Sequence, residues 1–513
     1  MIARLVCGAL QGIEAYKVEL EIDYTKAGMP AFVMVGLAEG AVKEAKERVF
    51  TAIRACAFKL APAKITVNLA PADRKKAGTA YDLPLAIGLL TASQNIHPSL
   101  NTEKIFFAAE LSLNGTLRPV SGILPLALLA RSLHMDAMIV ARENAGEAGI
   151  VDGLTVYGLD TLMDVLDFIC EKACFEPVRH KQGEECRSYD MDFSEVKGQE
   201  EAKLAIEIAA AGGHNLLFIG SPGSGKTMLA KRIPTILPSL TFEEALEVTT
   251  IYSVSNKLTA KGLVTARPFR SPHHTVSEIA LIGGGSYPKP GEVSLAHRGV
   301  LFLDELPEFS RSSLEVLRQP LEDGFVSISR SAQSLTYPAS CMLIAAMNPC
   351  PCGYYGDKKH ECTCSSQQLA RYRAKLSGPL LDRIDLHIEV PSVQFEDFHT
   401  DFKGKDSAGM KLRVENARKI QKERYKGTAC LTNADLSGAM LEKYCFLEQK
   451  ERDFLGKAVD RLALSARSFT RILKVARTVA DLEEQEKIAV SHIALAIQCR
   501  ALDRTMKNQG GIA

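Results

Sequence analysis

The eight residues from position 220 to position 227 carry the most specific chemical signal in the chain. They match the phosphate-binding pattern G-x-x-x-x-G-K-[ST] at every fixed position. The loop consists of Gly220, Ser221, Pro222, Gly223, Ser224, Gly225, Lys226 and Thr227. Its glycines let successive backbone N–H groups turn toward phosphate oxygens. Lys226 is placed to reach the β- and γ-phosphates, and the Thr227 hydroxyl is placed to ligate Mg²⁺. The pattern therefore predicts a site for a nucleoside triphosphate.

A pair of carboxylates follows an apolar run farther along the chain. Residues 300–303 are all apolar and precede Asp304 and Glu305. A parallel strand buried on both faces is continuously apolar, and ligands bind beyond the carboxyl ends of such strands. We expect Asp304 to hold Mg²⁺ and Glu305 to polarise the attacking water, as a Walker B pair does. A helix cap or a solvated turn is the alternative for such a pair, and the phosphate-binding loop upstream disfavours it.

The elements that must position these groups follow from the hydrophobic periodicity. The apolar run at 215–219 predicts a buried strand leading into the loop, and residues 228–233 predict a helix after it. A third apolar strand, at 341–347, ends in Asn348. AAA+ ATPases carry the sensor 1 residue at this place, although Asn before Pro is also an ordinary turn signal. The order of strand, loop and helix predicts a doubly wound α/β core with a parallel sheet.

Several longer stretches resemble one bacterial family. Residues 377–386 resemble the segment that presents an arginine finger in the Mg-chelatase and MCM branches of AAA+ ATPases. Further stretches resemble the insertion before Walker B and the helix and hairpin before sensor 1; they are 270–275, 283–285, 290–297 and 317–330. With these motifs the chain resembles the YifB/ComM group, a Mg-chelatase-like AAA+ family, over nearly its whole length.

This resemblance implies a complete ATPase site that two subunits share. Arg383 is the residue that would act on the neighbour's ATP, and its alternative is an intrachain pair with Asp382 or Asp385. Arg467 is the implied sensor 2 contact to the γ-phosphate, with Arg471 as the reserve candidate.

The resemblance also implies an assembly and a substrate. The assembly is a homo-hexamer, and the partner is single-stranded or branched DNA, which ATP hydrolysis moves through the ring during branch migration in homologous recombination or natural transformation. The alternatives are a protein-remodelling ATPase, a Mg-chelatase-like motor subunit and a non-catalytic DNA-binding scaffold. The retained catalytic residues argue against the scaffold.

Four cysteines are grouped after the sensor 1 position, and the YifB/ComM family shows a cysteine cluster there. They are Cys350, Cys352, Cys362 and Cys364. Two thiolate pairs separated by a loop could close a tetrahedral Zn²⁺ site, although C-x-C is a less usual spacing than C-x-x-C. Free reduced thiols are the alternative.

The chain divides into four segments by pattern and resemblance. Residues 1–170 resemble an α+β domain of the Lon-protease type. Ala80 and Leu124 stand where the catalytic serine and lysine of that type belong, so we expect no proteolysis. Residues 171–190 form a charged linker, residues 191–392 the AAA+ core with a cysteine-rich insertion at 350–364, and residues 393–513 a helical lid.

Composition limits the classes of partner and of location. The 513 residues have a formal net charge of +1, so there is no global basic field, and any DNA contact must be local. No run of about 20 apolar residues and no signal-peptide pattern occurs, which favours a cytoplasmic protein without a membrane partner. In that compartment the 13 cysteines are expected to be thiols or metal ligands rather than disulfides.

Overall fold

The chain folds into two compact units in the computed structural model. The described residues are 2–26, 29–37, 40–178, 190–258, 262–285, 288–330, 333–357, 359–392, 405–500 and 502. The first unit comprises Met1–Glu185 and Phe242–Val264, and the second comprises Cys186–Thr241 and Thr265–Ala513. Most of the predicted linker, at 179–189, lies outside the described residues.

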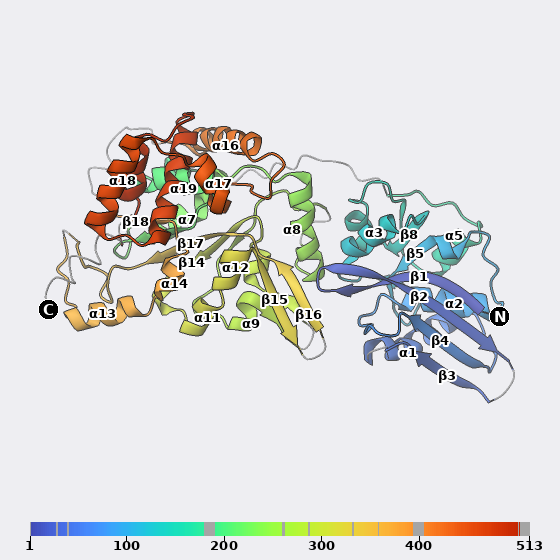
Figure 1. The fold of residues 1–513 in the computed structure, drawn as a ribbon. Helices are drawn as coiled ribbons and strands as arrows, with labels where there is room; N and C mark the ends of the chain where they lie inside the picture. The colour runs from blue at the N-terminus through green and yellow to red at the C-terminus, as the bar shows by residue number, and fades with distance from the viewer. Residues whose placement is uncertain are drawn as a thin grey trace. The chain divides into compact units, whose positions relative to one another are not determined.

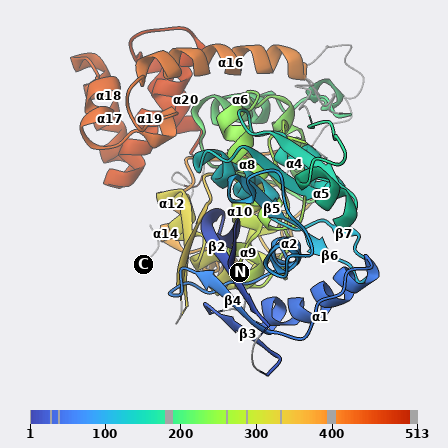
Figure 2. The ribbon, with the colours of Figure 1, turned by 90° about the vertical axis from the view of Figure 1, so that its right-hand side faces the viewer.

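The first unit is a mixed sheet with helices on both faces (Figure 1, Figure 2). Its elements are β1 (Ile2–Gln11), β2 (Glu14–Thr25), β3 (Ala31–Val35), α1 (Gly40–Ala55), β4 (Lys64–Ala70), α2 (Asp82–Ala92), β5 (Ile105–Ala108), β6 (Glu110–Leu111), β7 (Leu117–Arg118), α3 (Ile123–Ser132), β8 (Ala137–Ala141), α4 (Arg142–Ala148), β9 (Val156–Leu159), α5 (Leu162–Ile169) and α8 (Phe242–Val254). The seven strands run in the order β3-β4-β2-β1-β5-β8-β9, and β2 pairs antiparallel with both β1 and β4.

Along each strand the side chains point alternately to the two faces of the sheet. This unit therefore has two hydrophobic cores, one on each face. Neighbouring Phe106 and Phe107 of β5 belong to different cores, because successive strand side chains point to opposite faces. Helices α1, α2 and α5 supply one core, and α3 and α4 supply the other. Asn114 and Gly115 lie in the turn between β6 and β7, which pair antiparallel.

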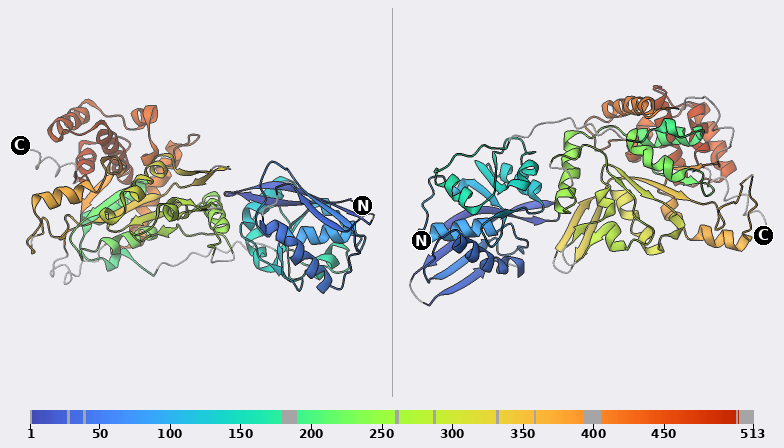
Figure 3. Two further views of the ribbon diagram at one scale, coloured as in Figure 1. Left: turned by 90° about the horizontal axis from the view of Figure 1, so that it is seen from below. Right: turned by 180° about the vertical axis from the view of Figure 1, so that it is seen from behind.

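The second unit is built on an all-parallel sheet with a helical region at its C-terminal end (Figure 3). Its elements are α6 (Glu200–Gly212), β10 (Leu216–Ile219), α7 (Lys226–Arg232), β11 (Phe269–Arg270), α9 (Glu278–Ile282), β12 (Gly283–Gly284), β13 (Lys289–Pro290), α10 (Glu292–Leu295), β14 (Val300–Leu303), α11 (Arg311–Glu315), α12 (Arg318–Asp323), β15 (Phe325–Arg330), β16 (Gln333–Pro338), β17 (Met342–Met347), α13 (Ser366–Ala374), α14 (Gly378–Leu381), β18 (Leu386–Glu389), α16 (Ser407–Arg424), α17 (Gly438–Tyr444), α18 (Gln449–Leu462), α19 (Ala466–Leu482) and α20 (Val490–Gln498).

The five parallel strands run in the order β11-β14-β17-β10-β18. All side chains of β10, β14 and β17 are buried. Full burial explains why these strands are continuously apolar in the sequence. Because neighbouring parallel strands end at one edge of the sheet, the residues that follow β10, β14 and β17 lie together there. The sequence-predicted parallel α/β sheet is therefore confirmed.

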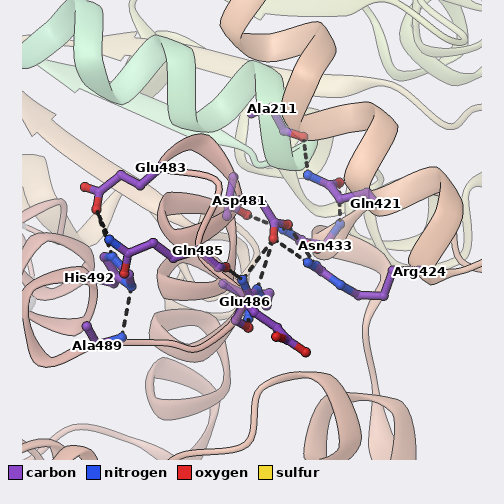
Figure 4. Close-up of polar contacts among 12 residues, drawn as sticks. Ala211, Gln421, Arg424, Asn433, Asp481, Glu483, Gln485, Glu486, Ala489 and His492 are labelled. Atoms are coloured by element: carbon purple, nitrogen blue, oxygen red, sulfur yellow. Dashed lines mark hydrogen bonds and ion pairs between the residues drawn. The ribbon is translucent and has the colours of Figure 1, made fainter.

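A buried ionic network holds the C-terminal helices together (Figure 4). The Asp481 carboxylate of α19 accepts hydrogen bonds from Arg424 of α16 at 2.9 Å and 2.5 Å and from Asn433 at 2.8 Å. Arg477 donates to the same carboxylate from one helical turn away. Gln421 of α16 donates to the Ala211 carbonyl at the end of α6, at 3.0 Å. The C-terminal helices are thus tied to α6.

The segment Phe242–Val264 differs from the boundaries drawn on the sequence, which placed it inside the ATPase core at 191–392. It folds with the first unit. Leu246 and Leu263 pack against the core that α3 and α4 supply, and the Gly122 amide donates to the Ser253 carbonyl at 3.2 Å. A segment that leaves one unit and returns has no local signal, because its apolar residues pack against partners distant in sequence.

Among the residues that the structure describes, no helix has the length and apolar character needed to cross a membrane.

Candidate functional site

The phosphate-binding loop joins the carboxyl end of β10 to α7. Gly220 is required by close packing, because a Cβ there would collide with the Val390 carbonyl oxygen. Gly225 has φ +91° and occupies the left-handed region directly before α7, where a side chain would be strained. These two glycines explain why the chain can turn tightly at this point.

Three sequence-predicted groups meet at Lys226. Its side chain is buried, and its ammonium donates to the carbonyl oxygens of Gly220 at 2.7 Å and Ser221 at 2.9 Å. It also donates to the Asn348 amide oxygen at 3.2 Å. Burial lowers the pKa of Lys226, and the nearby Asp304 carboxylate opposes that shift. The loop and the residue that ends β17 therefore form one site.

A pair of oxygen donors lies beside this lysine. The Thr227 hydroxyl donates to the Asp304 carboxylate at 2.6 Å. Mg²⁺ prefers oxygen ligands and is held in proteins by one or two carboxylates together with substrate phosphates. A hydroxyl and a carboxylate in contact at the phosphate-binding loop fit that preference, so these two residues could hold Mg²⁺.

Glu305 lies at the same edge and contacts His274, for which the sequence analysis predicts no role. Its backbone has φ +52°, and its amide donates to the Asp304 carboxylate at 2.9 Å. The His274 ring nitrogen Nδ1 lies 3.3 Å from Glu305 Oε2. The His274 ring also lies against the His273 ring, with centroids 4.1 Å apart and an angle of 34° between the ring planes. The only sequence signal for this contact is the adjacent pair of histidines at 273–274, within a stretch interpreted as an insertion.

Replacing His274 with alanine is expected to lower kcat for ATP hydrolysis about tenfold with little change in KM, because losing the contact that orients the Glu305 carboxylate is expected to cost about 1.4 kcal/mol of transition-state stabilisation. The variant His274→Asn, which keeps a donor, is expected to retain most of the activity. The measurement is steady-state ATP hydrolysis, with the exposed His97→Ala of the first unit as the control. An unchanged kcat in His274→Ala would show that the contact does not orient Glu305.

A cavity of about 420 Å³ adjoins Glu305 and Asn348. It is lined by Glu305, Glu308, Asn348, Pro351, Gln368, Arg371, Tyr372 and Lys375. Lys375 pairs with Glu308 at 3.0 Å, whereas Arg371 is exposed on α13. Cationic groups beside a catalytic carboxylate can bind phosphate oxygens. The sequence offered no reason to choose Arg371 among the basic residues of this helix.

The predicted arginines lie at the opposite end of the sheet from Lys226. In the parallel pair of β10 and β18, Leu216 faces Leu386 and Ile219 faces Glu389. The phosphate-binding loop follows Ile219, whereas Arg383 precedes β18. The Asn215 side chain, just before β10, donates to the Arg383 carbonyl at 2.8 Å. At about 3.3 Å per residue, the strand between the two ends spans about 10 Å.

Arg383 and Arg467 both lie at this end of the sheet, beside the loop that carries Asp382 and Asp385. Arg383 forms an intrachain ion pair with Glu322, rather than with the expected Asp382 or Asp385, and donates to the Pro379 carbonyl at 2.7 Å. Arg467 pairs with Asp382 at 2.8 Å. Arg471 pairs with Asp385, the residue directly before β18. Arg467 therefore lies near Arg383, at the end of the sheet opposite Lys226 of its own chain.

The four clustered cysteines fit a tetrahedral metal ion. Their sulfur atoms all lie within 4.8 Å of one another. Cys362 Sγ lies 3.7 Å from Cys350 Sγ and 3.6 Å from Cys352 Sγ. Four sulfurs at 2.3 Å from a tetrahedral Zn²⁺ lie about 3.8 Å apart, so the spacing suits one ion. An iron–sulfur cluster would hold the cysteines farther apart, because sulfide ions separate its irons.

The parallel sheet with its phosphate-binding loop, acidic pair and terminal asparagine defines an ATPase of the AAA+ type. Three magnesium chelatase families match successive parts of the chain: subunit ChlI of Mg-chelatase at residues 19–144, magnesium chelatase subunit ChlI at 192–398, and the C-terminal part of subunit ChlI at 404–500. Competence protein ComM of Haemophilus influenzae is 45% identical over 505 residues, 97% of each chain. The uncharacterized protein YifB of Escherichia coli is 43% identical over 499 residues, again 97% of each chain. The chain belongs to this Mg-chelatase-like ComM/YifB family.

A shorter match extends to a eukaryotic replication protein. DNA replication licensing factor MCM2 of Arabidopsis thaliana is 26% identical over 212 residues, which are 39% of this chain and 19% of MCM2. This match supports a distant relationship only.

Proposed function

We propose that this protein is a ring-forming ATPase that couples ATP hydrolysis to the movement of DNA. The observation that carries the proposal is the separation of the catalytic groups within one chain. Lys226, Asp304, Glu305 and Asn348 gather at the carboxyl end of the sheet, whereas Arg383 and Arg467 lie at its amino end. A second copy must supply the arginines, and head-to-tail repetition of such a contact closes into a ring, proposed to be a hexamer.

Each residue has a distinct role in the proposed reaction. The phosphate-binding loop and Lys226 hold the triphosphate, and Thr227 and Asp304 hold Mg²⁺, which neutralises phosphate charge. Glu305 accepts a proton from the attacking water, with His274 fixing its carboxylate. Asn348 senses the γ-phosphate, and the neighbour's Arg383 stabilises the charge that develops on the transferred phosphoryl group.

The proposed substrate is single-stranded or branched DNA, moved during branch migration in recombination or natural transformation. The support is the near full-length similarity to a competence protein and the distant similarity to a replication licensing factor. Strands β15 and β16, of six residues each, pair antiparallel as a hairpin, an element suited to gripping a threaded strand. For the first unit we propose a supporting role in assembly or substrate contact, because Leu124 is buried in its core and cannot act as a base.

The decisive test of the substrate is ATP hydrolysis measured with single-stranded, duplex and branched DNA at several salt concentrations. We expect single-stranded or branched DNA to raise the rate several-fold and the stimulation to fall as salt rises, since phosphate contacts release counterions. If no DNA binds and none changes the rate, the substrate is a protein or a chelatase partner instead. Stimulation by duplex DNA alone would contradict the preference for single-stranded or branched DNA.

For the four cysteines we propose one Zn²⁺ ion. The support is the spacing of their sulfur atoms and the backbone amides that point at them. Tyr355 N–H donates to Cys350 Sγ at 3.3 Å, and Cys352 N–H donates to Cys364 Sγ at 3.4 Å. Such amide donors stabilise the negative charge of thiolate ligands.

A further inference from the structure

The cysteine loop, residues 350–364, packs directly against the phosphate-binding loop. Gly353 is buried, and a Cβ on it would lie 2.6 Å from Pro222 Cδ and 2.7 Å from Pro222 Cγ. The Asp357 carboxylate accepts hydrogen bonds from the Lys359 amide at 2.7 Å and the His360 amide at 3.1 Å; these amides and, to a smaller degree, the nearby Ser221 side chain lower its pKa. Two residues of the phosphate-binding loop therefore have the cysteine loop as their neighbour.

Both ends of the cysteine loop also lead into the catalytic site. Cys350 follows Asn348 by two residues. Cys364 precedes Ser365, which caps α13: the Ser365 hydroxyl accepts from the Gln368 amide, and the Gln368 side chain accepts from the Ser365 amide at 2.9 Å. This helix carries Arg371 into the lining of the cavity beside Glu305. The position of the cysteine cluster thus sets the start of α13.

The cysteine loop has almost no apolar core to hold it in this shape. Between Met347 and Leu369, Cys350 is the only buried hydrophobic side chain among the residues that the structure describes. A segment that buries so little apolar surface does not recover the entropy lost on ordering. In small loops of this kind a bound metal ion supplies the missing stability.

We infer that metal bound by the four cysteines holds one wall of the nucleotide site, so that metal occupancy sets the affinity for ATP. This inference rests on the proposed ATPase function and on the proposed zinc ion. Without the metal, the contacts of Gly353 with Pro222 and of Asp357 with Ser221 lose their support. The phosphate-binding loop then has more conformations to lose when the triphosphate binds, and the affinity falls.

The test measures two quantities on the full chain: zinc content by elemental analysis, and the Kd of a fluorescent ATP analogue. We expect about one zinc per wild-type chain. Cys352→Ser is expected to lose the zinc and to raise Kd about tenfold. Gly353→Ala keeps all four cysteines but pushes a methyl group toward Pro222, so it is expected to keep the zinc and still raise Kd. Cys430→Ser, outside the cluster, serves as the control and is expected to change neither quantity.

The outcomes separate the inference from the functions on which it rests. Wild-type protein without zinc overturns the metal site. Zinc loss in Cys352→Ser with an unchanged Kd overturns the coupling, and so does an unchanged Kd in Gly353→Ala with its zinc retained. Wild-type protein that holds zinc but binds no ATP analogue contradicts the ATPase function itself. Circular dichroism of each variant checks that a raised Kd is not caused by global unfolding.

Discussion

Replacing Lys226 with alanine is expected to lower ATP hydrolysis by about 10²–10³-fold, because one preorganised charge that contacts the transferred phosphoryl group is lost. Tight ATP binding is expected to be lost as well. The ammonium is buried between the Gly220 and Ser221 carbonyl oxygens and the Asn348 amide oxygen, so no other described cation takes its place in these contacts. The measurements are steady-state hydrolysis and binding of a fluorescent ATP analogue.

Two matched variants serve as comparisons for this prediction. Lys231 lies on the same helix, α7, and is exposed, so Lys231→Ala is expected to bind and hydrolyse ATP like the wild-type protein. Glu305→Gln is expected to bind ATP but to hydrolyse it slowly, because Glu305 acts on the water and not on the phosphates. Full hydrolysis by Lys226→Ala would refute the assignment of the whole site.

Contiguous motifs made the core of this site predictable. The phosphate-binding loop, the acidic pair and Asn348 each end an apolar strand, and neighbouring parallel strands bring their carboxyl ends together without further information. The contact between His274 and Glu305 was not predictable in the same way, because it depends on how an insertion folds back over the end of β14. The cysteines were visible as a group, but their contact with Pro222 depends on the path of a loop.

The lid arginine shows a different limit of sequence reasoning. The similarity of motif predicts that Arg467 lies on a lid helix and contacts a nucleotide. It does not predict whether that nucleotide is bound by the same subunit or by its neighbour. That answer depends on the register of β10 and β18 and on the ion pair of Arg467 with Asp382. The segment Phe242–Val264 shows a related limit, since it lies within the predicted range 191–392 but groups with the residues of the first unit.

Arg383→Ala alone is expected to reduce ATP hydrolysis about 10³–10⁵-fold, the effect known for arginine fingers. Mixed in equal amounts with Lys226→Ala, it is expected to regain activity. In a mixed ring, about a quarter of the interfaces combine an intact Lys226 from one variant with an intact Arg383 from the other. Exposed Arg311→Ala is the control, and light scattering must show that every variant still assembles.

The same mixing experiment decides which subunit uses Arg467. If Arg467 acts on the neighbour's ATP together with Arg383, then Arg467→Ala regains activity with Lys226→Ala but not with Arg383→Ala. If it acts on the ATP of its own subunit, the pattern reverses, because Lys226 and Arg467 must then come from the same chain. We expect the first pattern, since Asp382 joins Arg467 to the loop that carries Arg383. Observation of the reversed pattern would require the lid to move away from Asp382 when the ring forms.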